Sequence, residues 1–263
     1  MKVGVSVITR DRLQMVQELI KSLDRTTFDE FVIVNDSEIA ISSEYFPNHP
    51  HEMIHTRGSG VGAAKNAALK YLLDKECDYI FVIEDDMKML RSDVFTAYIN
   101  ASKQTGIQHF LYNAHGPANR GGISGGKSIP RITIEYPSGV RISLFQHCVG
   151  AFCMYTRESL EAVGLMDEAF KNVWEHVEHS YRLVKAGYAP AYWWWPDLVN
   201  STDYIVEQAC SETSSTIRGN PQWRKNIEDG TKHFISKHGL SPVQIPDKPF
   251  SEVRVKLQQF TGL

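Results

Sequence analysis

The stretch Tyr79-Ile80-Phe81-Val82-Ile83-Glu84-Asp85-Asp86 decides the fold of this chain. Its first five residues are apolar, rich in aromatic and β-branched side chains, and of a length typical of a strand that is buried on both faces. Three acids follow at once, and such a cluster is costly to bury unless a cation or hydrogen-bond donors satisfy it. We therefore expect a buried strand that ends at a binding site.

Two other apolar runs end in polar residues in the same way. Residues 2–9 and 30–34 are predicted strands, followed by Thr9-Arg10-Asp11 and by Asn35-Asp36. Helices are predicted from Met15 to Leu23 and from Gly60 to Leu73, between the strands, and this alternation is typical of a parallel sheet covered on both faces. Such sheets bind ligands outside the carboxyl ends of their strands, so the three polar clusters should converge on one edge.

The second half of the chain has a different pattern. Residues 115–130 are rich in glycine, serine and proline, which predicts a loop that is either a lid or a surface insertion. Residues 132–145 predict a hairpin that turns at Ser138-Gly139. Helices are expected over 157–163 and 174–186, and the proline-spaced segment after Ser241 shows no core of its own.

The composition excludes several classes of protein. The chain has 263 residues, 42% of them hydrophobic, and a formal charge of -3, so no net positive field would hold it on nucleic acid or an anionic membrane. No run approaches the ~20 apolar residues of a membrane span, and the apolar stretch 3–8 is too short for a signal peptide, so we expect a cytoplasmic protein. Cys77, Cys148, Cys153 and Cys210 form no Cys-x-x-Cys pair and are predicted to be reduced thiols.

The acidic triplet has two interpretations. A divalent metal would satisfy Glu84, Asp85 and Asp86, and oxygen ligands suit Mg²⁺ or Mn²⁺. A solvated turn is the alternative, because most acidic triplets lie in water. The position of the triplet at the carboxyl end of a strand favours the metal.

These motifs together resemble those of the GT-A-fold glycosyltransferases, in particular family 2, over roughly residues 3–190. Thr9-Arg10-Asp11-Arg12 and Val34-Asn35-Asp36-Ser37 are similar to the ends of that family's first two strands, and residues 57–66 to its glycine-containing helix start. The most specific match lies in residues 149–168, with Gly150 in a glycine-rich strand.

The resemblance implies an α/β fold of GT-A type, with a mostly parallel central sheet flanked by helices and a small antiparallel hairpin insertion. Residues 1–240 would form the transferase domain, with a donor-binding half (1–110) and an acceptor and catalytic half (111–240), and residues 241–263 a C-terminal tail.

The resemblance also implies a nucleotide-sugar donor and a divalent metal, Mn²⁺ or Mg²⁺. Asp36 would hydrogen-bond the nucleobase, Glu84 would face the ribose, and Asp86 would bind the metal between the two phosphates. Lys65 and the backbone N–H groups of its helix start would lie beside the diphosphate. The full set of expected donor-binding residues is Thr9, Arg10, Asp36, Arg57, Gly60, Lys65, Glu84, Asp85 and Gly150.

Residues 174–183 resemble the family's helix that carries the catalytic base. The base position holds His176, so either His176 or its neighbour Glu175 would take the proton from an acceptor hydroxyl. His179, three residues further on, is a candidate metal ligand or a core residue. His233 and His238 are weaker metal candidates that we expect on a solvated helix.

The expected reaction is transfer of a sugar, with UDP the first candidate for the nucleotide, to an acceptor hydroxyl of a glycan, protein or modified nucleobase, with inversion. A degenerate domain that only binds nucleotide-sugar or glycan is the alternative, because Asn35, Lys65 and His176 depart from the family pattern. A sugar nucleotidyltransferase is less favoured, because residues 9–12 lack the glycine-rich loop of that class. The aromatic run 192–195 could stack on a sugar, although at least one of its rings must be in the core.

Overall fold

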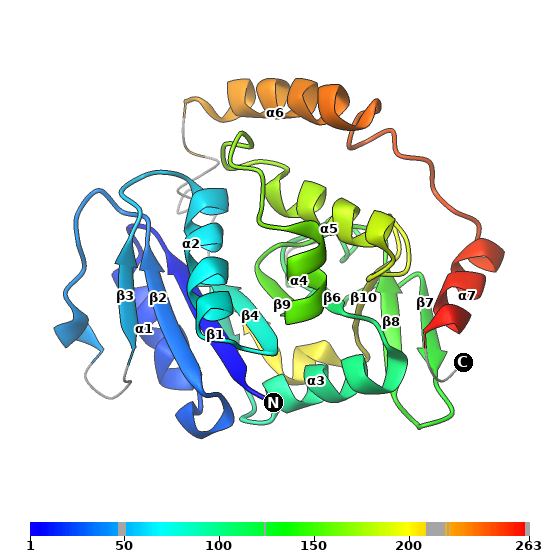
Figure 1. The fold of residues 1–263 in the computed structure, drawn as a ribbon, viewed down its shortest axis with the longest axis horizontal. Coiled ribbons are helices and arrows are strands. Elements are labelled where there is room, and N and C mark those ends of the chain that lie inside the picture. Colours follow the sequence, from blue (N-terminus) through cyan, green and yellow to red (C-terminus); the bar gives the residue numbers. More distant parts are fainter. Residues whose placement is uncertain (47–50, 124, 209–218, 220, 261–263) are drawn as a thin grey trace.

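The computed structural model describes residues 1–46, 51–123, 125–208, 219 and 221–260. A six-stranded sheet with helices on both faces forms its centre, and Figure 1 shows α2 in front of this sheet and α1 behind it. The main elements in chain order are β1 (Val3–Thr9), α1 (Leu13–Ser22), β2 (Glu30–Asn35), β3 (Glu52–His55), α2 (Val61–Asp74), β4 (Tyr79–Glu84), β5 (Met87–Met89), α3 (Val94–Thr105), β6 (His109–Leu111), β7 (Ile132–Glu135), β8 (Arg141–Phe145), β9 (Phe152–Thr156), α4 (Arg157–Val163), α5 (Glu175–Ala186), β10 (Trp195–Leu198), β11 (Ile205–Glu207), α6 (Trp223–His238) and α7 (Phe250–Gln259).

The central sheet has the strand order β3-β2-β1-β4-β9-β6. The first four strands are parallel, and β9 runs antiparallel to both of its neighbours. The register pairs Thr9 with Asn35 and Ile8 with Glu84, so the three polar clusters of the sequence follow neighbouring strands at one level. The mostly parallel α/β sheet that the sequence predicts is confirmed.

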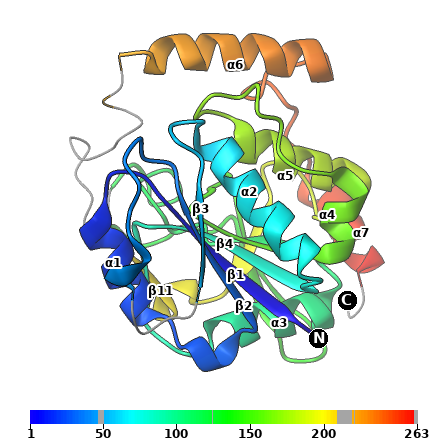
Figure 2. The same ribbon diagram turned by 60° about the vertical axis from the view of Figure 1, so that its left-hand side comes forward.

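Each sheet face buries its own set of side chains. Along β2, Phe31 and Ile33 join the core beneath α1 and α3, whereas Val32 and Val34 join the core beneath α2, α4 and α5. This alternation follows from the period of two in a strand, and burial on both faces explains why the strand sequence is continuously apolar. Figure 2 shows α2, α4 and α5 together on one side of the sheet.

Two smaller sheets extend the second half of the chain. The predicted hairpin is confirmed, because β7 and β8 pair antiparallel and turn at Gly139, whose φ of 83° is in the left-handed region. The strand β10 joins β8 to give the order β10-β8-β7. The strand β11 pairs with β5, directly after the acidic triplet, and so brings residues 205–207 to the edge where β4 ends.

The C-terminal segment joins this body. Val253 and Leu257 of α7 are buried in the main core, and the Phe250 ring lies 5.6 Å from that of Trp194. Figure 1 shows α6 across the top of the molecule and α7 beside β7 and β8. The segment after Ser241 therefore has no core of its own, as expected, but it completes the core of the preceding domain.

The aromatic run 192–195 is mostly core, which corrects the expectation of a stacking surface. Tyr192, Trp194 and Trp195 are buried, because the run leads into β10 and packs against the C-terminal segment. Only Trp193 is half-buried, and its Nε1 donates to the carbonyl of Ile245.

The three described cysteines are free, as predicted, and Cys210 lies outside the described residues. None of the helices that the structure describes has the length and apolar character that crossing a bilayer requires.

Candidate functional site

The three polar clusters meet at the carboxyl edge of the sheet, as the sequence predicts. The Thr9 hydroxyl at the end of β1 donates to Asp85 Oδ2 over 2.6 Å, which joins β1 to the triplet after β4. The backbone N–H of Asp36 bonds to the carbonyl of Thr9 over 2.8 Å, which joins the end of β2 to the same point. Arg10 Nη1 lies 3.5 Å from Asp36 Oδ2.

A cleft opens at this junction. Its lining comes from all three strand ends, from the first residue of α2 and from the segment before α5. Two arginines and two carboxylates lie on its walls, so it offers both cations and acceptors to a polar ligand. The lining residues are Ile8, Thr9, Arg10, Arg12, Asp36, Val61, Glu84 and Asn172.

The first two acids of the triplet are partnered within the protein. Glu84 Oε1 lies 2.6 Å from Lys65 Nζ. Asp85 is fully buried, with Thr9 and Arg12 on its oxygens. Burial raises the pKa of Asp85 to about 7, against the opposing effect of the Arg12 charge.

The third acid, Asp86, differs because the basic side chains around it lie beside only one of its oxygens, Oδ2. Its Oδ2 faces Arg12 Nη1 at 3.4 Å and His115 Nε2 at 3.5 Å, whereas its buried Oδ1 has no hydrogen-bond partner. His115 Nε2 also lies 3.6 Å from Glu207 Oε1. Burial lowers the pKa of His115, but the hydrogen bond and charge of Asp86, with the charge of Glu207, raise it overall.

The oxygens of Asp86 and Glu207 suit a divalent metal, but they do not form a complete ligand set. An unsatisfied buried carboxylate oxygen is what a cation would complete, and the oxygens of Asp86 and Glu207 are suitable hard ligands. No set of three His, Cys, Asp or Glu side chains in the described ranges is already arranged around a metal position. The site therefore resembles those in which one or two carboxylates bind the metal and substrate phosphates supply the rest.

Lys65 does not face the cleft, which corrects the prediction that it lies beside a diphosphate. Its side chain is fully buried, and Nζ donates to Glu84 Oε1 and to the carbonyl of Gly150 over 2.6 and 2.9 Å. Burial lowers the pKa of Lys65, but the neighbouring Glu84 charge outweighs this effect and raises it above the usual value. The helical period places Lys65 on the face of α2 that packs on the sheet.

Two backbone N–H groups at the start of α2 are bonded within the protein, whereas the resemblance implies N–H groups beside a diphosphate. The N–H of Val61 bonds to Asn172 Oδ1 over 2.8 Å, and the N–H of Gly60 bonds to Asp36 Oδ2 over 3.1 Å. Arg57 is exposed in the loop before the helix, with a φ of 50°. The cations that line the cleft are instead Arg10 and Arg12.

The two candidate bases form a hydrogen-bonded pair at the start of α5. His176 Nδ1 lies 2.8 Å from Glu175 Oε1, and the side chains are 24% and 4% exposed respectively. Burial raises the pKa of Glu175, but His176 and Lys65 outweigh it and hold the pKa at about 2. A Cβ on Gly150 would lie 2.6 Å from His176 Cγ, so the absent side chain makes room for the imidazole.

His179 is a core residue, which corrects its prediction as a candidate metal ligand. Its ring is fully buried, its Nε2 bonds to the carbonyl of Gly164 over 2.9 Å, and it packs against Tyr155. Burial lowers its pKa to about 3. His233 and His238 bond to Asp167 and Glu178 instead of to the acidic triplet, and the His238 side chain is only 5% exposed where we expected solvent.

Sequence patterns did not identify His115, Glu207 and Asn172 as site residues. Each lies outside the helices or at the end of a short strand. Such segments have no repeating apolar pattern from which the direction of a side chain could be predicted. Arg12 was part of a recognised motif, but its contacts with Asp85 and Asp86 were not expected.

Comparison with known proteins supports the fold. No protein-family model matches the chain. An uncharacterized glycosyltransferase, R363, of Acanthamoeba polyphaga mimivirus is 25% identical over 234 residues, which cover 82% of this chain and 85% of that protein.

Several solved glycosyltransferases share the architecture. The mannosyltransferase PcManGT of Pyrobaculum calidifontis, in complex with GDP-Man and Mn²⁺, superposes with a TM-score of 0.56 at 13% identity, covering 98% of this chain and 68% of its own. GalNAc-T7, with UDP, GalNAc and Mn²⁺, gives 0.54 at 12% identity, covering 98% and 54%. The catalytic domain of Drosophila β1,4-galactosyltransferase 7 gives 0.52 at 12% identity, covering 94% and 85%. The predicted GT-A fold is thereby confirmed, whereas the assignment to family 2 stays a prediction.

Proposed function

Because the chain has the GT-A fold, we propose that it is a glycosyltransferase that moves a sugar from a nucleotide-sugar, with a UDP-sugar the first candidate, to an acceptor hydroxyl. The observation that carries the proposal is the unsatisfied buried oxygen of Asp86, at the strand edge beside the cleft that Arg10 and Arg12 line. The name of the mimivirus relative, and the nucleotides and Mn²⁺ in the complexes of the structural neighbours, agree with it.

In this proposal the nucleotide-sugar binds in the cleft at the ends of β1, β2 and β4. Thr9, Asp36 and Glu84 offer polar groups to the nucleoside, and Arg10 and Arg12 offer positive charge to the diphosphate. Lys65 and Asp85 hold Glu84 and Thr9 in position through side-chain hydrogen bonds and do not contact the donor. Gly60 and Gly150 hold neighbouring segments in place.

The metal, Mn²⁺ or Mg²⁺, would be held by Asp86, with Glu207 and His115 beside it. When bound, it would offset the negative charge that develops on the departing diphosphate. Asp86 is already ionised for this role, because the neighbouring His115 and Arg12 lower its pKa against the effect of burial.

His176 is the proposed base, and Glu175 positions it. Glu175 is held ionised, so His176 Nδ1 carries the proton of their hydrogen bond and Nε2 remains the basic nitrogen. His176 Nε2 takes the proton of the acceptor hydroxyl while the acceptor oxygen forms a bond to the anomeric carbon. The bond from that carbon to the diphosphate breaks on the opposite face, which inverts the configuration.

Donor turnover tests the proposal directly. Purified protein with Mn²⁺ is incubated with a panel of nucleotide-sugars, and the release of free nucleotide is measured with and without hydroxyl acceptors. We expect slow hydrolysis of at least one donor. Absence of both turnover and nucleotide binding by titration would refute the transferase, whereas binding without turnover would favour the degenerate binding domain.

Substitution of Asp86 tests the metal. Asp86→Asn keeps the shape of the side chain but removes its charge, and we expect Mn²⁺-dependent nucleotide binding to weaken at least ~10-fold. Asp74→Asn, at an exposed position of α2, is the matched control. Equal binding by both variants would contradict the metal assignment.

The pair at the start of α5 has its own test. His176→Ala should abolish transfer without a change in nucleotide affinity. Glu175→Gln should lower kcat with little change in KM or nucleotide affinity, because the imidazolium that forms in the reaction loses its counter-charge. An unchanged kcat would contradict the positioning role.

A further inference from the structure

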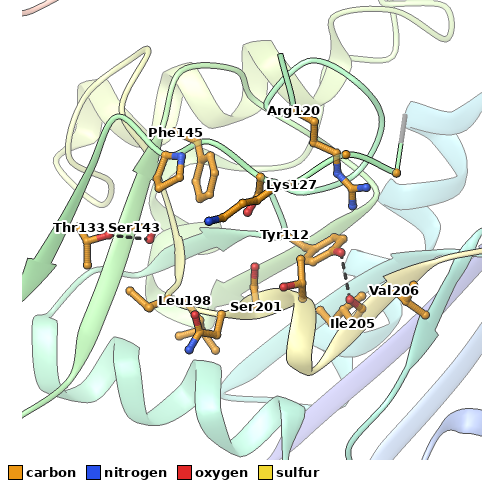
Figure 3. A pocket seen from close by; sticks show the side chains of 17 residues that line it. Tyr112, Arg120, Lys127, Thr133, Ser143, Phe145, Leu198, Ser201, Ile205 and Val206 are labelled. Atoms are coloured by element: carbon orange, nitrogen blue, oxygen red, sulfur yellow. Dashed lines mark hydrogen bonds between the residues drawn. The ribbon is translucent and has the colours of Figure 1, made fainter. Parts of the chain in front are cut away.

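A second cavity, of about 480 Å³, lies apart from the donor cleft. Its walls come from the hairpin β7–β8, from β11 and the turn before it, and from the glycine-rich loop that follows β6. Figure 3 shows Arg120 and Lys127 on the loop side of this cavity, facing Tyr112, Ser201 and Leu198. No residue of the proposed donor site lines it.

The lining of the cavity is positive and rich in hydroxyl groups. Arg120 and Lys127 supply two cations, and no aspartate or glutamate is among the described residues that line it. Serine and threonine hydroxyls of the opposite wall add donors and acceptors, including those of Thr133, Ser143 and Ser201. An anion that also carries polar groups matches this combination.

Arg120 is the residue that points to a ligand. It is only 8% exposed, and its Nε is buried without a hydrogen-bond partner. Its neighbour on the cavity wall is the Tyr112 hydroxyl, which donates to the carbonyl of Ile205 over 3.0 Å and is a neutral group. No carboxylate of the described residues forms an ion pair with Arg120; a buried guanidinium without a counter-charge is costly, and an anion in the cavity would remove that cost.

The cavity is connected to the proposed transfer site through β11. Val206 lines the cavity, whereas the next residue, Glu207, faces His115 and accepts from the N–H of Gly116. The N–H of Gln208 then bonds to the carbonyl of Asp86 over 2.6 Å. Two residues of extended strand, roughly 7 Å, therefore separate the cavity wall from the end of the acidic triplet.

We propose that this cavity binds the acceptor through an anionic group, a phosphate or a carboxylate, held by Arg120 and Lys127. The proposal rests on the transferase function proposed above, since it assigns the second substrate of that reaction. Arginine matches the two oxygens of either group in a bidentate manner, and lysine adds a mobile charge. An acceptor anchored in this way would extend its hydroxyl past β11 towards the metal site.

The test measures binding of defined anions and does not depend on turnover. Glycerol 3-phosphate and glucuronate are titrated calorimetrically into the full chain, with glycerol and glucose as uncharged counterparts. We expect at least one anion to bind and both uncharged compounds to fail. The anion that binds identifies the phosphate or the carboxylate, whereas failure of both anions at millimolar concentration would overturn the proposal.

Charge-matched variants locate the binding. Arg120→Gln with Lys127→Gln should weaken the anion at least ~10-fold, because two charge-assisted contacts are lost. Lys70→Gln with Arg254→Gln removes the same charge from exposed positions of α2 and α7 and should leave binding unchanged. Lys127→Gln alone provides the test if the Arg120 substitution prevents folding. Equal loss in the control pair would show a non-specific effect of net charge and overturn the proposal.

Nucleotide binding separates this proposal from the proposed function. UDP with Mn²⁺ should bind the Arg120→Gln, Lys127→Gln variant as it binds the unmodified chain. If UDP binds neither protein while the anion still binds, the transferase proposal fails and the anion site stands. If UDP displaces the anion and the variant loses both ligands, the cavity belongs to the donor site and the acceptor proposal fails.

Discussion

The pair of Lys65 and Glu84 allows a prediction in which the two halves of one ion pair have unequal effects on stability. The Lys65 side chain is fully buried, whereas that of Glu84 is 21% exposed at the cleft. Lys65→Met leaves a carboxylate that cleft water can solvate. Glu84→Gln leaves a buried ammonium whose hydrogen-bond acceptors are both neutral, the new amide and the carbonyl of Gly150, with Glu175 as the remaining nearby carboxylate.

The expected magnitudes follow from this difference in exposure. Breaking a buried ion pair by removing one partner costs about 3–5 kcal/mol when the other charge stays buried, so Glu84→Gln should lower the free energy of unfolding by about 3 kcal/mol. Lys65→Met should cost about 1–2 kcal/mol, because the remaining charge reaches solvent. The double variant should be more stable than Glu84→Gln alone, with a coupling of about 2 kcal/mol.

The pH dependence gives an independent check on Glu84→Gln. In the unmodified chain the Glu84 charge raises the pKa of Lys65, so the pair contributes stability that is lost only in strongly alkaline solution. Without that charge, burial is opposed by smaller effects such as the charge of Glu175, and we expect it to lower the pKa of Lys65 in the folded state below the unfolded value. The loss of unfolding free energy caused by Glu84→Gln should therefore become smaller as the pH rises from 7 to 9, because the Lys65 amine is then buried in its uncharged form.

The assay is urea unfolding followed by tryptophan fluorescence, in EDTA so that bound metal does not contribute. The pair of Lys70 and Asp74, 2.9 Å apart and exposed on the same helix, is the control, and its removal should cost no more than ~0.5 kcal/mol. The reasoning is refuted if Lys65→Met is as costly as Glu84→Gln, or if the two effects simply add.

Three further predictions concern single residues. His109 is buried with a pKa lowered to about 4 by burial, so its contribution to stability should be lost as the pH falls from 6.5 to 4, by about 3 kcal/mol in all; His109→Gln should make urea-unfolding energies fall less steeply over that range, with buried His179 accounting for part of the remaining slope. Gly150→Ala places a Cβ 2.6 Å from His176 Cγ, so kinetics should show transfer reduced to the level of His176→Ala, with no further loss in the double variant. Tyr98→Phe removes a buried 2.7 Å hydrogen bond to Asp197 and should lower the urea-unfolding free energy by about 1–3 kcal/mol; no loss would mean that the other three donors on that carboxylate suffice.

The sheet and its binding edge could be predicted from the sequence because local patterns determine them. A continuously apolar run such as 79–83 can only be a strand buried on both faces once helices flank it. Parallel strands place their carboxyl ends together, so the meeting of Thr9, Asp36 and Asp85 followed from topology alone. Neither inference needed the contact of any one side chain.

The partners of individual charges could not be predicted, because they depend on which face of a helix is buried. Lys65 was expected beside a phosphate as a member of a helix start, but it lies on the same face as Ala68 and Leu72 and therefore points into the protein. His176 and His179 are three residues apart, and the helical period leaves them far enough around α5 that one contacts Gly150 and the other Gly164. Glu207 reaches the acidic triplet through the pairing of β11 with β5 and meets His115 of the loop after β6, a contact between segments far apart in the sequence.

The acidic triplet shows how three adjacent carboxylates acquire three different roles. Glu84 is paired with Lys65, and Asp85 with Thr9 and Arg12, so the protein itself balances the first two acids. Asp85 Oδ1 and Asp86 Oδ1 both lack a hydrogen bond, but Asp85 Oδ1 is in ion-pair contact with Arg12, whereas the contacts of Asp86 with Arg12 and His115 are made through Oδ2. A divalent cation that arrives with a diphosphate would therefore find one ligand ready and two acids already occupied. Because Asp85 is buried and partnered, Asp85→Asn should preserve metal-dependent nucleotide binding better than Asp86→Asn, and the opposite order would assign the metal to the second acid.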